Sequence, residues 1–424
     1  MEHDVVIVGG GAAGLMCACV AAGRGLRVLL IEKMDQCGRK LRITGKGRCN
    51  LTNTASLRDT LPRIGSSTAT SKPGKGQGNG GVWLRNAYGR FFNRELMDYF
   101  ERRGVPLTEE RGGRVFPASG KALDVFLALI GELEANPKVT IRKNCTVKKV
   151  ETYEGHVTGV VLQDGSRIGC RRVVLATGGM SYPTTGSTGA GLRMAAELGH
   201  TVVEAVPALV PLRCQEPLPS EVEGFVLKNV GLSLLFDDGS RSDYFGEMAF
   251  CRDGLAGPIA ISASRAASRR LHSGQTVRAL IDLKPALDAE QLDRRLRLDI
   301  DQNGKRLFND ALRMWLPAEI VGLALKRLHI EYYKRLHQLN GDERRRLGKW
   351  LKGVEFTLCG THDFNEAIVT QGGVSLTEVN PKTMESLLVG GLYVVGELLD
   401  LDADTGGFNL QIAFSTAHAA AMAL

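Results

Sequence analysis

The chain has 424 residues, 43% of them hydrophobic and 24% charged, and its formal net charge at pH 7 is +8. The length predicts two or three domains with ample core, and the composition is ordinary for a soluble globular protein. We find no run of 18 apolar residues, so we expect no membrane span. Nine cysteines without a C-x-x-C pair indicate reduced thiols and a cytoplasmic protein, and they argue against a disulfide reductase.

The beginning of the chain predicts a β-α-β unit. Val5–Val8 is a short β-branched run that predicts a buried strand, and a helix is expected from Ala12 to about Gly23. Arg27–Ile31 predicts the second strand. Three glycines lie between the first strand and the helix at G-x-G-x-x-G spacing, namely Gly9, Gly11 and Gly14. This arrangement favours dinucleotide binding, with a chance glycine-rich turn as the plain alternative.

Each residue of this motif has a physical role. Gly9 permits the tight turn, Gly11 lets a pyrophosphate approach the helix N-terminus, and Gly14 lets helix and strand pack closely. Glu32 follows the second strand, where its carboxylate can accept hydrogen bonds from both ribose hydroxyls and would repel a 2′-phosphate. We therefore expect FAD or NAD rather than NADP.

Residues 38–53 combine glycines, cations and small polar side chains with little apolar periodicity. We expect a loop around an anionic cofactor, with Arg39 and Lys40 near phosphates and Asn50 or Thr52 near polar ring atoms. An exposed basic loop is the alternative. The glycine- and serine-rich residues 65–81 are expected to be mobile.

The next segment predicts helices and then short strands. Asn93–Gly104 predicts a helix capped by Asn93, and residues 121–135 predict an amphipathic helix. Short β segments separated by turns predict a meander, at residues 139–141, 146–150, 156–162 and 167–168. A meander after a glycine-rich β-α-β start is typical of glutathione-reductase-like FAD domains. Val173–Gly179 then predicts a buried strand whose small final residues suit a nearby ligand.

From about residue 201 the pattern predicts an inserted domain. Strands are expected at 209–212, 227–236 and 241–245, with Pro211 limiting the first to a sheet edge, and helices at 258–271 and 286–352. The expected division is 1–198, 199–358 and 359–424. The basic stretch 326–352 is compatible with a nucleic-acid surface, although a solvated helical face is the commoner explanation.

The last segment predicts a return to the first domain. It contains the buried strand 391–397, an acidic loop, and a small-residue helix at 412–423 that Gly406-Gly407 opens. Free N–H groups at such a helix start would stabilise the negative charge of a reduced flavin by ~1 kcal/mol. Asp400, Asp402 and Asp404 indicate a solvated or calcium-like loop, but three aspartates are too few for a calcium site, and we expect no metal.

Several motifs together resemble one bacterial family. They are the Gly9–Gly14 fingerprint, GRKLRITGKGRCNLTN at 38–53, GGRVFP at 112–117, VVLATGG at 173–179, the VTQGGVS and NPKTMES strings, and GGLYVVGELLDLDADTGGFNLQ at 390–411. The chain is similar to the NAD(P)/FAD-dependent oxidoreductase family, also called the aminoacetone oxidase family, which includes a bile-acid-inducible 3-dehydro-bile-acid reductase. The resemblance covers nearly the whole chain apart from residues 65–78. It implies an α/β flavoprotein with a glutathione-reductase-like Rossmann FAD domain built from both chain ends, plus an inserted β-barrel-like and helical domain.

The resemblance also implies the residues that contact FAD. They are Gly9, Gly11, Ala12, Ala13, Gly14, Glu32, Lys33, Arg39, Lys40, Thr44, Gly45, Cys49, Asn50, Val147, Ala176, Thr177, Gly178, Gly179, Gly396, Glu397, Gly407, Phe408, Asn409, Leu410 and Gln411. One departure stands out. Relatives usually have Phe-Thr-His-x-Gly-Leu-Ser-Gly-Pro where this chain has Phe250-Cys251-Arg252-Asp253, which would change the role of that histidine, for example to anion binding by Arg252.

These observations predict an FAD-dependent oxidoreductase that passes hydride through flavin N5 to an unsaturated or carbonyl-containing apolar small molecule. NAD(P)H is the expected transient reductant, docked over the flavin because the chain has only one dinucleotide fingerprint. A flavin-dependent RNA-modifying or RNA-binding protein and a non-catalytic flavoprotein are the alternatives. The sequence favours a small-molecule substrate over a nucleic-acid partner. Catalytic residues are not identified, because Cys49 and Glu397 are expected to position the cofactor.

Overall fold

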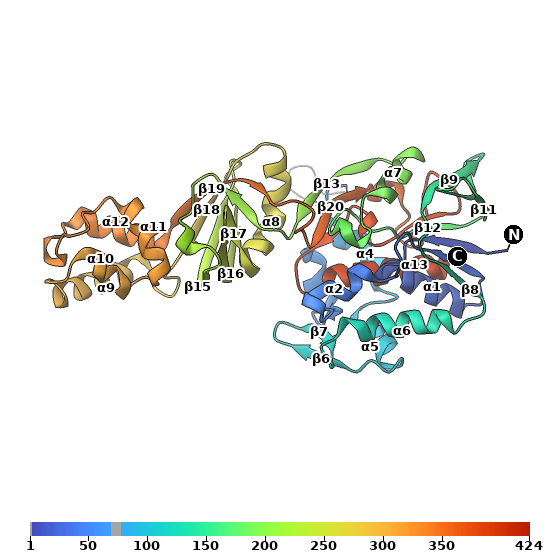
Figure 1. Ribbon diagram of the computed structural model, residues 1–424, viewed down its shortest axis with the longest axis horizontal. Coiled ribbons are helices and arrows are strands. Elements are labelled where there is room, and N and C mark those ends of the chain that lie inside the picture. The colour runs from blue at the N-terminus through green and yellow to red at the C-terminus, as the bar shows by residue number, and fades with distance from the viewer. Residues whose placement is uncertain (1, 69–77) are drawn as a thin grey trace. The chain divides into compact units, whose positions relative to one another are not determined.

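The computed structural model describes residues 2–68 and 78–424, which form two compact units (Figure 1). Unit 1 comprises the chain up to Pro207 together with Ala367–Leu424, and unit 2 comprises Ala208–Glu366. Each unit has its own hydrophobic core. The boundaries lie a few residues after those expected at 198 and 358, since β13 (Val202–Ala208) pairs with β20 (Val369–Val374) and β19 (Val354–Thr361) belongs to a barrel in unit 2.

Unit 1 is built on a five-stranded parallel sheet with the order β21-β12-β1-β2-β8. The strands are β1 (Val5–Val8), β2 (Val28–Ile31), β8 (Val139–Arg142), β12 (Val173–Leu175) and β21 (Leu392–Val394). Every residue of β1, β2, β12 and β21 is buried, which accounts for their continuous apolar runs, because both faces of this sheet are covered. The first and last parts of the chain therefore meet in one sheet, as expected.

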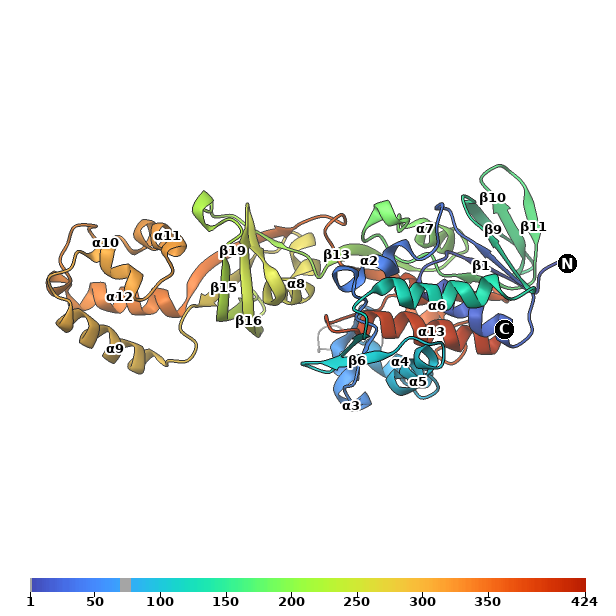
Figure 2. The same ribbon diagram turned by 60° about the horizontal axis from the view of Figure 1, so that its bottom comes forward.

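Helices and a small antiparallel sheet cover the parallel sheet. Helix α1 (Ala12–Gly23) packs on α13 (Phe408–Ala423) and α6 (Ala122–Glu134), while the meander of β9 (Val147–Tyr153), β10 (His156–Leu162) and β11 (Arg167–Gly169) lies across the sheet from α6 (Figures 1 and 2). The expectation that residues 139–141 belong to the meander is wrong, because β8 pairs with β2 in parallel.

The remaining elements of unit 1 are short. They are α2 (Arg39–Gly47), β3 (Thr52–Asn53), α3 (Leu57–Thr60), η1 (Leu61–Arg63), β4 (Ile64–Ser66), β5 (Gly78–Asn79), α4 (Gly80–Tyr88), α5 (Asn93–Glu101), β6 (Leu107–Glu110), β7 (Arg114–Pro117), η2 (Pro183–Thr185), α7 (Ala190–Glu197), η6 (Leu376–Glu378), η7 (Gly396–Leu398) and β22 (Asp402–Ala403). The N-cap position of α5 is Phe92, whose N–H donates to Glu95 Oε2, so the predicted Asn93 cap is wrong by one position. Most of the stretch expected to be mobile lies outside the described residues.

Unit 2 contains a closed barrel, β14-β17-β16-β15-β18-β19, as the sequence predicted. Its strands besides β19 are β14 (Leu212–Cys214), β15 (Val226–Leu235), β16 (Arg241–Cys251), β17 (Gly254–Ala256) and β18 (Val277–Asp282). Its helices are α8 (Gly257–His272), α9 (Ala289–Gln302), α10 (Phe308–Ala311), α11 (Ala318–Leu328) and α12 (Gly341–Lys352). Short turns of 3-10 helix are η3 (Ser220–Val222), between β14 and β15, and η4 (Leu312–Met314) and η5 (Leu336–Gln338), between the helices. The strand expected at 209–212 is a connection up to Pro211, and only Leu212 enters the barrel. Within the described residues, we find no helix with the length and apolar character that a membrane crossing requires.

Candidate dinucleotide site

The turn between β1 and α1 requires glycine at two of its three motif positions. Gly9 has φ +107°, and a Cβ there would lie 2.6 Å from the Ala176 carbonyl oxygen. A Cβ on Gly14 would lie 1.8 Å from the Gly9 carbonyl oxygen. At Gly9 and Gly14, strand and helix therefore approach each other more closely than any side chain would permit.

Gly11 differs from its neighbours because a Cβ there would meet no atom of the other described residues within 4 Å, apart from those adjacent in the chain. It precedes the first residue of α1, and no side chain caps that helix start. The first N–H groups of α1 and the positive end of its dipole therefore face outward at an open backbone surface. Such a surface suits the pyrophosphate of a dinucleotide.

Glu32 is buried beside this turn and is held by two backbone groups. Its Oε2 accepts from the Gly10 N–H at 2.7 Å and its Oε1 accepts from the Met34 N–H at 2.8 Å. The backbone carbonyl of Glu32 accepts from Cys145 N–H at 3.0 Å, which brings the beginning of β9, with Val147, to the same end of β2. A carboxylate fixed at the end of β2 has the position expected of a ribose-binding group.

The two cations after Glu32 have partners near the surface. Lys33 Nζ donates to Thr188 Oγ1 at 2.8 Å, and burial lowers the pKa of Lys33. Arg39 donates to Asp35 at 2.5 Å, one turn earlier in the sequence. Both side chains are therefore already positioned by neighbours.

The stretch expected to be a loop begins as helix α2, which is a correction to the prediction. Arg39–Gly47 is helical in part, but Thr44 is extended and Gly45 and Lys46 have positive φ, so the helix breaks there. The side chain of Leu41 fixes the segment because it is buried in the core. Cys49 is fully buried behind the break, and burial raises the pKa of its thiol to about 12. A thiol of this kind stays protonated and is a poor nucleophile near pH 7.

Four segments meet around the carboxylate of Glu397. Lys40 Nζ donates to Glu397 Oε2 at 2.6 Å and to Ser181 Oγ at 2.5 Å. Ser181 Oγ donates to Glu397 Oε1 at 2.9 Å, and the Thr370 N–H donates to the same oxygen at 2.8 Å. Ser181 and Thr370 were not predicted as site residues, although Ser181 lies just after the VVLATGG motif and Thr370 lies within VTQGGVS.

The segment after β12 lies against the same groups. A Cβ on Gly178 would lie 3.7 Å from Glu397 Oε2, and one on Gly179 would lie 2.3 Å from Thr370 Oγ1. Ala176, as noted above, abuts the glycine turn. The small residues expected to let a ligand approach therefore also let this loop approach Glu397 and β20.

The start of α13 is a second uncapped helix terminus. Gly407 precedes it with φ +98°, and a Cβ on Gly407 would lie 2.3 Å from the Thr52 carbonyl oxygen. The side-chain amide of Asn50, suitably oriented, donates to that carbonyl at 3.1 Å and accepts from the Gly407 N–H at 3.0 Å. Thr52 Oγ1 donates to Gln411 Oε1 at 2.5 Å, which ties the first turn of α13 to β3.

Three further residues of this terminus are placed by neighbours. Asn409 Nδ2 donates to the Ala403 carbonyl at 2.9 Å, and the Phe408 ring lies 5.4 Å below the Arg63 guanidinium. Leu410 packs at the edge of the core. Gly396 also approaches the first helix, because its Cβ would lie 3.0 Å from Ala13 Cβ.

The acidic loop is not solvated at its first two positions. Asp400 and Asp402 are buried. Asp400 Oδ2 accepts from Ser66 Oγ at 2.9 Å and from the Ser67 and Thr68 N–H groups at 2.7 and 2.8 Å. Asp400 thus holds the segment after β4.

Four of the nine lysines and arginines in the basic stretch 326–352 pair with acids of unit 2. Lys334 pairs with Glu343 at 2.7 Å, Arg344 with Asp293 at 2.8 Å and Lys352 with Asp282 at 2.6 Å. Arg345 also pairs with Asp342. Local acids therefore weaken the expectation that this stretch attracts nucleic acid.

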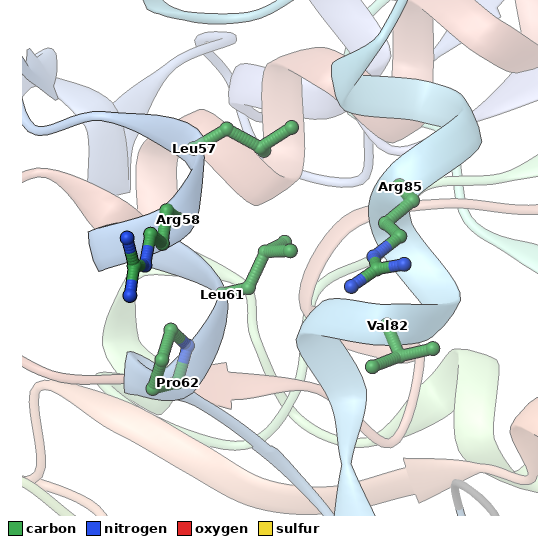
Figure 3. A pocket seen from close by; sticks show the side chains of 6 residues that line it. All are labelled: Leu57, Arg58, Leu61, Pro62, Val82 and Arg85. Carbon is green, nitrogen blue, oxygen red and sulfur yellow. The ribbon is translucent and has the colours of Figure 1, made fainter.

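A shallow pocket of about 480 Å³ lies between the α3–η1 segment and α4 (Figure 3). Leu57, Leu61, Pro62 and Val82 line it, with Arg58 on one side and Arg85 on the other. The pocket therefore combines an apolar floor with two guanidinium groups.

The fold and this site define a Rossmann-type dinucleotide-binding protein. Residues 3–423 match the family model described as HI0933-like protein Rossmann domain. The 3-dehydro-bile acid delta(4,6)-reductase of Clostridium scindens is 30% identical over 99% of this chain and 98% of its own length. The ribosomal RNA dihydrouridine synthase of Escherichia coli is 30% identical over 100% of this chain and 98% of its own.

A solved 3-ketosteroid-delta4-(5alpha)-dehydrogenase from Rhodococcus jostii RHA1 is 15% identical, with a TM-score of 0.47 over 99% of this chain and 96% of the other. The full-length family match and the 30% identical relatives carry the assignment. The chain belongs to the HI0933-like family of FAD-binding Rossmann proteins. It is accordingly a flavoprotein of the oxidoreductase class.

Proposed function

We propose that the protein is an FAD-dependent reductase of a carbon–carbon double bond conjugated with a carbonyl group. The observation that carries this proposal is the chemistry shared by the names of its relatives. A 3-dehydro-bile acid delta(4,6)-reductase acts on double bonds in a molecule with a 3-oxo group. Dihydrouridine is uridine whose C5–C6 double bond, next to the C4 carbonyl, is saturated. Both reactions add two hydrogens to an electron-poor alkene.

The proposed cofactor path follows the site described above. The ribose would bind Glu32, the pyrophosphate would lie at Gly11 and the start of α1, and the flavin ring would lie near the start of α13. The further proposed contacts are Gly9, Ala12, Ala13, Gly14, Lys33, Arg39, Lys40, Thr44, Gly45, Cys49, Asn50, Val147, Ala176, Thr177, Gly178, Gly179, Gly396, Glu397, Gly407, Phe408, Asn409, Leu410 and Gln411. The open backbone at Gly11 and the two uncapped helix starts support this fit, because both suit anionic groups. Bound FAD would supply hydride transfer at N5.

The residues of the chain then have supporting roles. The first N–H groups of α13 would stabilise negative charge by ~1 kcal/mol. Cys49 does not serve as a proton donor in this scheme, because its buried thiol is a weaker acid than water-exposed thiols. Glu397 is a positioning residue, since both of its oxygens already accept hydrogen bonds. The proton that completes the reduction would come from solvent or from the side of the site that faces the substrate.

NAD(P)H is the proposed reductant. The Gly9–Gly14 fingerprint joins β1 to α1, and we propose that it holds FAD. A nicotinamide nucleotide would then bind only transiently during reduction of the flavin.

Charge distribution favours a uracil base in ribosomal RNA as the substrate. Residues 38–115 contain 16 lysines and arginines and 6 acids, a net charge of 16 − 6 = +10, which exceeds that of the whole chain. Lys46, Arg58, Arg85 and Arg111 have no carboxylate within salt-bridge distance among the described residues. Unpaired cations of this kind supply the electrostatic part of RNA binding. An apolar 3-oxo steroid-like molecule, the substrate type expected from the sequence, is the second candidate because of the bile-acid relative.

The test is anaerobic reduction of the flavoprotein by NADH or NADPH, followed by addition of deproteinised ribosomal RNA or a 3-oxo-Δ4 steroid. We expect RNA to reoxidise the flavin, with a uridine that gains two hydrogens in nucleoside mass spectrometry. Reoxidation by the steroid alone would move the assignment to the second candidate. Reoxidation by neither substrate, with a flavin that oxygen reoxidises normally, would contradict conjugated-alkene reduction.

A further inference from the structure

Three metal-ligating side chains from distant parts of unit 2 meet at one end of its barrel. Cys251 is the last residue of β16, and Asp253 lies in the two-residue turn that connects β16 to β17. His362 directly follows β19. The three candidate ligand atoms, Cys251 Sγ, Asp253 Oδ1 and His362 Nε2, all lie within 4.8 Å of one another.

The turn explains why two of these side chains converge. Cys251 pairs with Gly254 across the hairpin, so only Arg252 and Asp253 form its tip. Arg252 is exposed, whereas Cys251 and Asp253 are partly buried and face His362. The barrel holds this register on its other side, because the Cys214 N–H donates to the Asp253 carbonyl at 2.9 Å.

The separations between these atoms are close to those of a tetrahedral zinc site. The sulfur lies 3.9 Å from Asp253 Oδ1 and 4.0 Å from His362 Nε2, and the last two atoms are 2.9 Å apart. Tetrahedral bonds of 2.0–2.3 Å to zinc would place such atoms roughly 3.3–3.6 Å apart. Shifts of about half an ångström or less in each separation would therefore complete the geometry.

The histidine and the carboxylate are already oriented by outer partners. Glu366 Oε1 accepts from His362 Nδ1 at 2.7 Å, which turns Nε2 toward the cluster, where it donates to Asp253 Oδ1 until a metal ion replaces its proton. Arg213 Nε donates to Asp253 Oδ2 at 2.9 Å, which leaves Oδ1 facing the cluster. Carboxylate–histidine pairs and hydrogen-bonded carboxylate ligands are the usual outer shell of a metal site.

We propose that Cys251, Asp253 and His362 form a binding site for one divalent transition-metal ion, best matched by Zn²⁺, with water as the fourth ligand. One thiolate, one imidazole and one carboxylate are a zinc donor set rather than a magnesium or calcium set. Without Cys251, the other two side chains form only an ion-pair network with Glu366 and Arg213. The thiol is also the residue at which this chain departs from the threonine expected in the family it resembles. The ion would join the β16–β17 turn to the segment that leaves β19.

The proposal predicts one metal per chain, with direct coordination by sulfur. We would strip the holoprotein with a chelator, add Co²⁺ and record difference spectra against the metal-free flavoprotein. The expected signals are a thiolate-to-cobalt charge-transfer band and tetrahedral cobalt bands in the red, where oxidised flavin does not absorb. Added Zn²⁺ should displace the cobalt and raise the melting temperature.

Cys251→Thr is the test variant, and Cys359→Ser is the matched control, since Cys359 is an exposed thiol on the adjoining strand β19. Cys251→Thr should lose the sulfur band, whereas Cys359→Ser should keep it. Glu366→Gln should weaken Zn²⁺ binding by about 10–100-fold while the sulfur band remains. Absence of stoichiometric binding to the unmodified protein, or a sulfur band that survives in Cys251→Thr, would overturn the proposal. Circular dichroism of each variant shows that loss of binding is not loss of fold.

Discussion

Lys40 and Glu397 are 357 positions apart in the sequence, yet Lys40 Nζ lies 2.6 Å from Glu397 Oε2. The pair joins α2, near the start of the chain, to η7, in its final part. Ser181 and the backbone of Thr370 complete the hydrogen bonding around the same carboxylate. This network joins the last segment of unit 1 to the segment that follows the glycine turn. Because all of its partners donate to Glu397, the side chain at this position must be an acceptor at both oxygens, as a carboxylate is.

Glu397→Gln should therefore destabilise unit 1. The variant keeps the size of the side chain but removes the counter-charge of Lys40. About a fifth of each side chain is exposed, so the cost should lie between that of a surface pair and that of a buried pair, about 1–2 kcal/mol in the free energy of unfolding. Urea denaturation of the FAD-free protein would measure it. Glu355→Gln, which removes the mostly exposed partner of Arg278, is the control and should change stability by less than about 0.5 kcal/mol.

Gly11→Ala should weaken FAD binding and leave stability unchanged, whereas Gly14→Ala should lower stability. Gly11 has an ordinary φ of −80°, and a Cβ there meets no protein atom, so the FAD-free variant should keep its melting temperature. FAD affinity should fall by at least about tenfold, or 1.4 kcal/mol, because the methyl group would occupy the proposed pyrophosphate position. Gly14→Ala should instead lose about 1–3 kcal/mol of stability from the clash with Gly9.

Gly23→Ala is the matched control for this pair. It lies at the other end of the same helix, and a Cβ there also meets nothing within 4 Å. Affinity measured by quenching of flavin fluorescence should not change in this variant. A Gly11→Ala protein that binds FAD like the unmodified protein would place the pyrophosphate elsewhere.

The sequence predicted those parts of unit 1 that have a local pattern. A β-branched run, a glycine triplet and a small-residue helix can each be recognised from a few consecutive residues, so β1, α1 and α13 were predictable. Helix α2 was not, because one buried leucine, Leu41, fixes it and a single apolar residue has no periodicity. The place of Val139–Arg142 was missed for a related reason, since a short strand has the same local pattern whether it joins a meander or a parallel sheet.

The polar parts of the candidate site were predictable only in part. Glu32 and Lys40 lie in motifs with many supporting residues. Ser181 and Thr370 are single hydroxyl residues whose role depends on Glu397, far away in the sequence. The ion pairs of the basic stretch 326–352 were likewise missed, because some of the acids that neutralise it, such as Asp293, lie in α9 and only the fold brings them near.

His200 should make stability depend on pH below neutrality. Its side chain is fully buried between Glu378 and Ser386, at 3.2 Å and 2.9 Å, and burial lowers its pKa despite the opposing effect of Glu378. The unfolded chain, with a histidine pKa of about 6.5, then binds more protons than the folded chain. Stability is thus fully present above pH ~6.5 and falls as the pH drops toward the folded pKa, by at most about 1.4 kcal/mol per pH unit.

The comparison with His200→Gln isolates this group. Burial and Arg90 lower the pKa of His418, which acts in the same direction, whereas His362 has a raised pKa and acts in the opposite direction. Glu378, whose pKa is lowered, loses its contribution only below about pH 4.5. Urea denaturation between pH 7.5 and about pH 5.5 should therefore give a smaller slope in the variant. Equal slopes would show that His200 has the same pKa in the folded and unfolded chains, which would contradict a pKa lowered by burial.

Arg58 and Arg85 should contribute to RNA binding if residues 38–115 form the RNA surface. They flank one pocket (Figure 3), and neither has a carboxylate partner among the described residues. Replacing both with glutamate should weaken binding of ribosomal RNA fragments and reduce the slope of log Kd against log salt by about 1–2, because each lost phosphate contact on a single strand accounts for about 0.7. Lys326→Glu with Lys349→Glu makes the same change of charge in the stretch 326–352, and it should leave the slope nearly unchanged. Filter binding at several salt concentrations separates the two surfaces, and a larger effect from the second pair would move the RNA surface to unit 2.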